Sequence, residues 1–347
     1  MRRTVIGGVV LGALAALAGT APAGAEAPAQ ANQVTTPFNV LSTTAVGPSP
    51  NRVTYGYGAA WTLNGNGSVS RVDATTGAVK TTTTGPNPRD IRAGFNRIWV
   101  LSSTKTKASI VTLNTAGAKV GKTISINLGT TTDLGPGAQN GANTLGVGSG
   151  FVWVAGVRTW QKLGSIDPDT AKVVVKTWPV PQAFSAADSA LWMVTPNQAS
   201  IQKRKPSNLS ILDTLPVGAA TGGTAGSLWL TFGSSFFWLS QSTPNDLGQI
   251  NNVSPTTGLV AGAVSKGLGI TLTCTAAGGD AVWATQRPDS LGGTAALLFR
   301  LSQTDLSPVA SGTLPAGANP GAVQCVTVGG GLVWVTDGVG SLYKIQP

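Results

Sequence analysis

The stretch from Arg52 to Gly85 decides the fold of this chain. It consists of four runs, RVTYGYG, AAWTLNG, SVSRVDATTG and AVKTTTTG, separated by glycine and small polar residues. Short runs rich in Val, Thr and aromatic residues between turn signals predict β-strands. The Asp73–Gly77 segment offers side-chain acceptors and a glycine that can adopt positive φ, both of which suit a tight hairpin. The stretch therefore predicts one antiparallel unit of four strands.

The Trp of the second run recurs along the chain in similar apolar segments. Seven anchors follow one another at intervals of 38 to 54 residues, namely Trp61, Trp99, Trp153, Trp192, Trp238, Trp283 and Trp334. A strand-and-turn repeat of this length is typical of β-propellers. We predict an all-β, seven-bladed β-propeller with four-stranded blades over residues 38–347. The anchors are expected to fill the space between neighbouring sheets, with stacking on a ligand as the alternative. Trp229 is expected in an inner strand.

The two ends of the repeat region complement each other. The unit around Trp334 stops after three strands at Pro347, whereas Phe38–Gly47 has strand character and precedes the first complete unit. We expect this N-terminal strand to close the ring as the outer strand of the last blade, which removes exposed sheet edges.

The two cysteines occupy matched positions. Cys274 and Cys325 each lie nine residues before a Trp anchor, which places both in inner strands of adjacent blades. Inner strands of a narrow ring come within disulfide reach, and an exported protein favours the oxidised form. A disulfide is predicted, and two buried unlinked thiols are the alternative.

The N-terminus has the features of an export signal. Residues 1–25 combine Arg2 and Arg3 with an apolar run and a small-residue Ala23-Gly24-Ala25 site, as in signal peptides. Residues 26–37 are expected to be a flexible lead-in. The apolar run is short for a membrane span. We therefore expect a secreted, extracellular monomer with no transmembrane anchor, exported by the general or the twin-arginine route.

Charge and composition narrow the possible partners and reactions. The chain has 347 residues and a formal net charge of +10, or +8 without the two arginines of the signal. A basic exported protein is attracted to anionic envelope polymers, although the charge also serves solubility. No nucleic-acid-binding motif is present, so nucleic acid is not an expected partner. The chain has no His, and its one Glu is Glu26, which excludes His-based nucleophile activation and His-ligated metals. No cofactor and no metal site are predicted.

Candidate ligand-binding residues come from the loops expected to share one face of the ring. This set is net basic and contains one aromatic residue, and ordinary loop solubility is the competing interpretation. It comprises Arg89, Asp90, Lys105, Lys107, Arg158, Trp160, Arg287, Asp289 and Asp337. Arginines bind oxygen anions well, so this face predicts a cup for an anionic or sugar-like ligand. The run Lys203–Lys205 is interpreted as a solvated face, with contact to an acidic partner as the alternative.

A loose pattern links the chain to a known group. Gly85-Pro86-Asn87-Pro88 precedes Trp99-Val100, Ile166–Thr170 carries an Asp-x-x-Thr-type turn, and Gly317-Ala318-Asn319-Pro320 precedes Trp334-Val335. This pattern resembles secreted bacterial propellers of the YVTN, NHL and streptogramin-lyase-like group. The resemblance implies the fold. The lyases of that group look like metal-assisted enzymes that need a catalytic His, so their activity is not carried over to a chain without His.

The sequence therefore favours an exported, non-catalytic propeller that binds a ligand or partner. That ligand would be an anionic or glycan-like molecule of the cell envelope, or a protein. A lyase- or hydrolase-type enzyme using Asp and Lys is the alternative, and a purely structural surface protein is a third possibility.

Overall fold

The computed structural model describes most of the unit from Val34 to Pro347. The described residues are 38–104, 107–127, 143–156, 160–179, 181, 183–187, 189–195, 200–216, 228–232, 237–242, 248–256, 272–286, 297–313 and 324–347. The predicted signal peptide and lead-in lie outside them. Every regular element in the described residues is a β-strand.

Six antiparallel sheets have four strands each, and in each one the strands pair in the listed order. Two come from the first part of the chain: β2 (Pro50–Gly56), β3 (Ala59–Asn64), β4 (Ser68–Asp73) and β5 (Val79–Thr83); then β6 (Pro88–Gly94), β7 (Arg97–Ser103), β8 (Lys107–Leu113) and β9 (Ile124–Asn127). Two follow in the middle: β10 (Thr144–Gly148), β11 (Phe151–Gly156), β12 (Trp160–Ile166) and β13 (Val173–Thr177); then β14 (Ala183–Ala187), β15 (Ala190–Val194), β16 (Ser200–Arg204) and β17 (Ile211–Pro216).

The remaining two four-stranded sheets contain the C-terminal part of the chain. One comprises β21 (Leu272–Gly278), β22 (Ala281–Gln286), β23 (Leu297–Ser302) and β24 (Pro308–Thr313). The other combines β25 (Cys325–Gly329), β26 (Leu332–Thr336) and β27 (Ser341–Ile345) with β1 (Val40–Ala45) from the N-terminal end.

The prediction of seven four-stranded blades is wrong, because the structure has six. The sheet between β17 and β21 contains three described strands, β18 (Leu228–Phe232), β19 (Phe237–Ser242) and β20 (Gly248–Val253). The predicted outer strand of this unit, up to Gly262, falls outside the described residues. Spacing between Trp anchors counts second strands, and it cannot show that a full set of four strands is hydrogen-bonded around each one.

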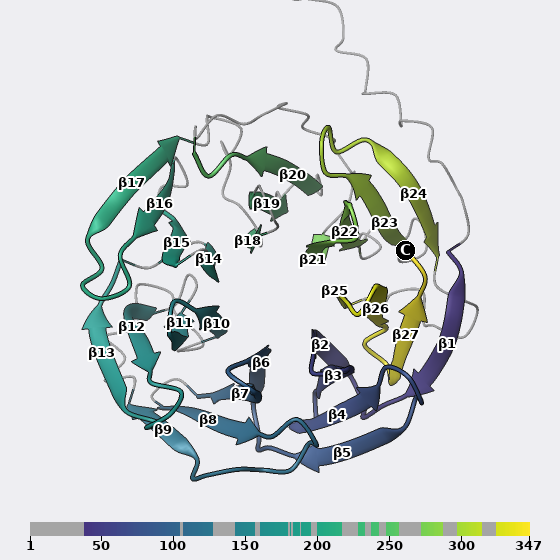
Figure 1. Cartoon of the computed structure of the whole chain (residues 1–347), viewed down its shortest axis with the longest axis horizontal. Helices are drawn as coiled ribbons and strands as arrows, with labels where there is room; N and C mark the ends of the chain where they lie inside the picture. The colour runs from purple at the N-terminus through teal and green to yellow at the C-terminus, as the bar shows by residue number, and fades with distance from the viewer. Residues whose placement is uncertain are drawn as a thin grey trace, which may run out of the picture. The chain divides into compact units, whose positions relative to one another are not determined.

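The innermost strands of neighbouring sheets contact one another in a closed cycle. It runs through β2, β6, β10, β14, β18, β21 and β25 and returns to β2. Figure 1 shows these strands around the centre of the unit, with the outer strands at its rim. Trp229 lies in the innermost strand β18, as predicted.

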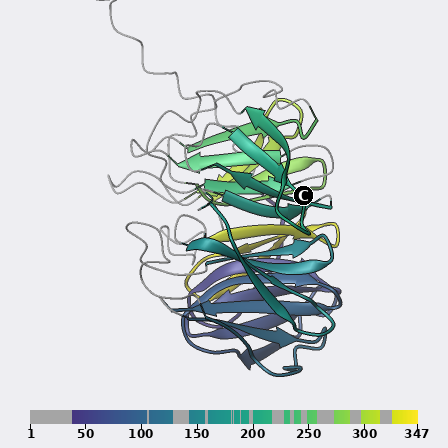
Figure 2. The ribbon, with the colours of Figure 1, turned by 90° about the vertical axis from the view of Figure 1, so that its left-hand side faces the viewer.

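The N-terminal strand closes the cycle as predicted. β1 pairs antiparallel with β27, from Val40 opposite Ile345 to Ala45 opposite Ser341. The purple β1 and the yellow C-terminal strands lie side by side in Figure 1 and Figure 2. The Phe38 ring also packs on Trp283 of the adjacent sheet at 5.7 Å between centroids. The two ends of the unit are therefore joined by backbone hydrogen bonds and by apolar packing.

The described Trp anchors form the core between sheets. Six have described side chains, and these are at most 3% exposed: Trp61, Trp99, Trp153, Trp192, Trp283 and Trp334. In five of them the indole Nε1–H donates to the carbonyl five residues earlier, as from Trp61 to Gly56 at 3.0 Å. Burial of a large apolar ring with its one polar atom satisfied explains why Trp recurs at this position. Core packing is confirmed for these six.

Lysine and arginine side chains cover several of these Trp rings. Four anchors face a basic residue directly across on the third strand, as Trp61 faces Arg71 and Trp192 faces Lys203. Each of these cations lies 5.1–5.8 Å from the ring centroid. Such contacts are attractive, and the aliphatic stems add apolar cover. Part of the net positive charge therefore serves packing between blades.

The Lys203–Lys205 run belongs to this packing. Lys203 stacks on Trp192, and Arg204 lies 5.2 Å from the Trp178 ring and donates to the Leu209 carbonyl at 2.9 Å. Burial lowers the pKa of Arg204. The first two residues of the run therefore hold neighbouring side chains in place rather than forming a fully solvated face.

Candidate functional site

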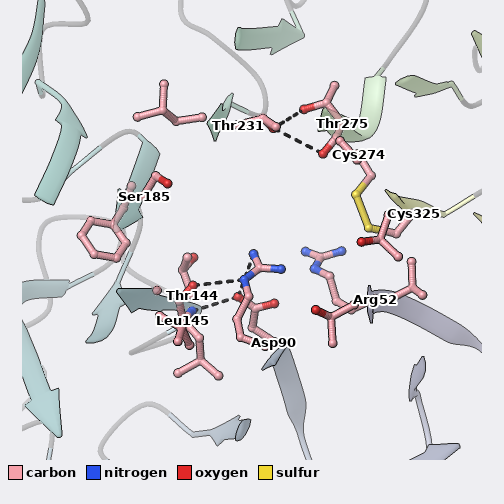
Figure 3. Close-up of a pocket in the computed structure, with 18 of the residues that line it drawn as sticks. Arg52, Asp90, Thr144, Leu145, Ser185, Thr231, Cys274, Thr275 and Cys325 are labelled. Atoms are coloured by element: carbon pink, nitrogen blue, oxygen red, sulfur yellow. Dashed lines mark hydrogen bonds and ion pairs between the residues drawn. A yellow bond between two sulfur atoms is a disulfide. The ribbon is translucent and has the colours of Figure 1, made fainter. Parts of the chain in front are cut away.

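The innermost strands surround a cavity of about 680 Å³. Residues from all the strands of the closed cycle line it, from β2 and β6 through β18 to β21 and β25. Figure 3 shows Arg52, Asp90, Thr144, Ser185 and Thr231 around this space, with the disulfide at one side. Small-molecule sites in proteins occupy about 300–1,000 Å³, so the cavity is large enough for a small ligand.

Three arginines and one aspartate carry the charge of the cavity wall. Arg52 comes from β2, and Arg89, Asp90 and Arg92 come from β6. These are the charged residues among the described lining residues, and they sum to +2. The guanidinium group of Arg52 points into the cavity (Figure 3). A cavity wall of this charge attracts anions.

Local backbone irregularities place these charges. The register of β2 with β3 shifts between Pro50 and Arg52, and that of β6 with β7 shifts between Pro88 and Asp90. Proline is tolerated at the first residue of a strand, and a bulge redirects the side chains beside it. The same Gly-Pro-x-Pro sequence precedes both shifts, at Gly47–Pro50 and at Gly85–Pro88.

Asp90 connects two neighbouring sheets. Its side chain is 3% exposed, and Oδ2 accepts the backbone N–H of Leu145 on β10 at 2.9 Å. Oδ1 accepts the N–H of Ile91 at 2.9 Å. The carboxylate is therefore held by two backbone donors, and its main role in the described structure is to position its neighbours.

Arg92 is the partner of Asp90. Its Nη2 lies 3.3 Å from Asp90 Oδ2, and its Nε donates to the Leu145 carbonyl at 3.3 Å. The Arg92 side chain nevertheless remains 41% exposed. Asp90 and Leu145 thus orient the guanidinium group while leaving part of it open to the cavity.

The predicted disulfide is confirmed. Cys274 on β21 and Cys325 on β25 are bonded, with Cα atoms 4.8 Å apart. Both residues line the cavity, close to the Thr231 Oγ1–Thr275 Oγ1 hydrogen bond of 2.8 Å that joins β18 to β21. The bond links the sheet that contains β1 to the sheet before it, so it reinforces the closure of the ring at the cavity wall.

The structure brings two of the predicted ligand-binding residues to the cavity, Arg89 and Asp90. Asp337 lies elsewhere: it is 2% exposed, and its Oδ1 accepts the N–H groups of Val339, Gly340 and Ser341 at 2.8–2.9 Å. It organises the turn before β27, and with burial its charge raises the pKa of Tyr343. Lys107 is exposed at the start of β8.

Several predicted residues cannot be placed relative to the cavity. Lys105, Arg158, Arg287 and Asp289 lie outside the described residues. Trp160 is the first residue of β12, paired with Gly156, rather than a loop residue, and its side chain lies outside the description.

Sequence reasoning missed Arg52 and Arg92. The signal for Arg52 was the repeated Gly-Pro-x-Pro sequence, which places Arg52 in the position of Asp90 in the next unit. No sequence signal identified Arg92, because its contribution depends on its contact with Asp90 and with β10.

The described residues contain no group of three or more Cys, Asp or Glu that could hold a metal ion. Within the same residues, no helix is long and apolar enough to cross a membrane.

A closed cycle of four-stranded antiparallel sheets around a central cavity defines the chain as a β-propeller. No family model matches the sequence, and no curated protein matches it. Solved structures share the fold. The β-propeller domain of Cps50 (Swd1) from Myceliophteria thermophila aligns with a TM-score of 0.63 and 11% identity, over 90% of this chain and 100% of the other.

Two further structures give similar alignments. Virginiamycin B lyase from Staphylococcus aureus aligns with a TM-score of 0.60 and 14% identity, over 88% of this chain and 98% of the other. The computationally designed protein Ika8 aligns with a TM-score of 0.59 and 9% identity, over 90% of this chain and 100% of the other. Identities this low establish the fold and do not transfer function.

Proposed function

We propose that this protein is an exported binding protein whose central cavity holds an anionic ligand. The observation that carries the proposal is the pairing of Arg52, Arg89 and Arg92 with a single carboxylate, Asp90, around a cavity of about 680 Å³. Charge-assisted hydrogen bonds from guanidinium groups to oxygen anions are among the stronger polar contacts in proteins. The Asp90 contacts orient Arg92 before any ligand arrives, which lowers the entropic cost of binding.

Export fits the remaining observations. The disulfide is typical of proteins in oxidising compartments, and residues 1–25 have the pattern of a signal peptide. A secreted bacterial protein of this kind would meet anionic polymers and glycans of the cell envelope, or acidic surfaces of a protein partner. We propose that it acts as a monomer, without a cofactor.

A binding role accounts for the cavity better than catalysis does. Asp90 is the one carboxylate among the described lining residues, and its oxygens already accept two backbone N–H groups. The lyase activity named for the Staphylococcus aureus neighbour belongs to that protein, and the absence of His here argues against transferring it.

Isothermal titration calorimetry on the mature protein tests the proposal. The probes are inorganic phosphate, glucuronate and a polyglycerol phosphate, each titrated into wild type, Arg52→Gln and Arg92→Gln. We expect at least one probe to bind and its affinity to fall at least about tenfold in each variant, as expected when a charged contact is lost. Lys122→Gln, an exposed residue away from the cavity, is the matched control.

A parallel variant tests the loop residues. If the ligand also contacts the predicted loops, Arg158→Ala combined with Trp160→Ala weakens binding further. If no anion binds to the wild-type protein, the proposed function is wrong.

A further inference from the structure

The cavity wall changes character along its depth. The strand register defines levels, because in each sheet one residue of the innermost strand lies opposite the Trp anchor: Thr54, Arg92, Gly146, Ser185 and Thr327 share this middle level. Two residues towards the start of each strand, the wall carries Arg52, Asp90 and Thr144. The polar end of the cavity is therefore the end where the innermost strands begin.

The opposite end of the cavity is apolar. One residue beyond the middle level, five different strands contribute Ala93, Val147, Ala186, Ala277 and Val328. All five line the cavity, and all are partly exposed rather than buried in the core. Open apolar surface at this level gains free energy when a hydrocarbon group covers it.

The middle level separates the two ends and carries hydroxyl groups. Thr54, Ser185, Thr231 and Thr327 line the cavity there, beside Arg92. Arg92 reaches back towards the polar end, since its Nη2 contacts Asp90. From the level of Arg52 to the apolar level is three residues, or about 10 Å of strand.

On the basis of the proposed function, we infer that the ligand is a small amphipathic anion. Its anionic group would bind at Arg52 and Arg92, and an apolar chain or ring would extend towards Val147, Ala277 and Val328. The distance of about 10 Å suits an organic acid with a short aliphatic chain or one aromatic ring. A sugar acid fits less well, because the described side chains at the apolar level offer no hydroxyl, amide or charged group to its ring hydroxyls.

Calorimetry with a homologous series tests this inference on the mature protein. The probes are acetate, butanoate, hexanoate and octanoate, with 1-octanol as the neutral analogue and glucuronate as the polar one. Affinity is expected to rise with each added methylene until the apolar end is filled, by up to about fourfold per methylene. Octanoate should also bind at least tenfold more tightly than 1-octanol or glucuronate.

Two variants separate the two ends of the site. Arg92→Gln should weaken every carboxylate by a similar factor and leave the gain per methylene unchanged. Val328→Thr keeps the side-chain shape and adds a hydroxyl at the apolar level, so it should weaken octanoate several-fold while acetate is unaffected. Thermal unfolding of each variant verifies that the fold is retained, and Ala277→Ser provides a second substitution at the same level.

The possible outcomes are distinguishable. Equal affinities for acetate and octanoate, with both reduced by Arg92→Gln, would overturn the amphipathic ligand and leave the anion site standing. Binding of 1-octanol as tight as that of octanoate would overturn the role of the anionic group. Failure of octanoate and of every other anion to bind would overturn the proposed function together with this inference.

Discussion

The carboxylate of Asp90 accepts the backbone N–H of Leu145 at 2.9 Å, although the two residues belong to different sheets. The same carboxylate holds Arg92 at 3.3 Å, and Arg92 returns a hydrogen bond to the Leu145 carbonyl. One buried acidic side chain therefore joins two neighbouring innermost strands and orients a charged group of the cavity.

Replacing Asp90 by Ala should lower the free energy of unfolding by about 1–3 kcal/mol, because the Leu145 N–H loses its acceptor. Asp90→Asn should lose less, since the amide oxygen can still accept from Leu145. Urea denaturation measures the difference, with the exposed Asp213→Ala as the control. Equal stability of Asp90→Ala and wild type would show that the contact between the sheets is not stabilising.

Removing the closing strand should destabilise the whole propeller. A protein that starts at residue 48 lacks β1, so β27 has an unpaired edge and Trp283 loses the packed ring of Phe38. We expect a loss of several kcal/mol in the free energy of unfolding, measured by circular dichroism during thermal unfolding. A protein that starts at residue 38 is the matched control. If both proteins melt at the same temperature, β1 does not stabilise the closed ring.

Loss of the disulfide should also destabilise the fold. The Cys274–Cys325 bond closes a sequence separation of 51 residues, for which loop entropy predicts about 4 kcal/mol. The Cys274→Ser, Cys325→Ser double variant should unfold at correspondingly lower denaturant concentration. Reduction of the wild-type protein should give a similar loss, and a variant as stable as the oxidised protein would contradict the expected role.

The cation–Trp pairs should contribute modestly and individually. Lys203 lies 5.1 Å from the Trp192 ring centroid and faces it across the strands. Lys203→Ala should cost about 0.5–1 kcal/mol, whereas Lys203→Arg should retain most of the stability. Chemical denaturation detects the loss, and Lys122→Ala serves as the control. A loss of the same size in the control would remove the specific role of the pair.

Acid should destabilise the protein within a defined pH range. Backbone N–H groups in the turns lower the pKa of Asp73, which bonds to Thr76 and Thr75, and of Asp305, which bonds to Ser307, from 3.8 to about 2. A carboxylate with a lowered folded-state pKa stabilises the protein above its unfolded pKa and loses that effect as the pH falls through the folded value. The melting temperature should therefore drop between about pH 4 and pH 2.

The double variant Asp73→Asn, Asp305→Asn checks the source of this acid sensitivity. It should show a shallower drop over the same range than wild type, while the two proteins respond similarly between pH 5 and pH 7. A drop of equal depth in both proteins would place the acid-sensitive groups elsewhere.

Part of the candidate site was predictable from the sequence, because the responsible residues act locally. Arg89 and Asp90 follow a Gly-Pro-x-Pro loop at the start of an innermost strand, and the cysteines lie at a constant distance from a Trp. Arg52 was missed although it follows the same loop sequence. Arg92 could not be identified, since its orientation depends on Asp90 and on a strand 53 residues away.

By itself, the sequence determined the class of the fold, the closing N-terminal strand and the paired cysteines. These features follow from local strand patterns that repeat at a near-constant interval. The tertiary structure alone decided that six blades are four-stranded, that Asp337 organises a turn, and that Arg52 and Arg92 face one cavity with a polar and an apolar end. The physical reason is that each cavity level collects residues from strands far apart in the chain, and only their register and the closure of the ring bring them together.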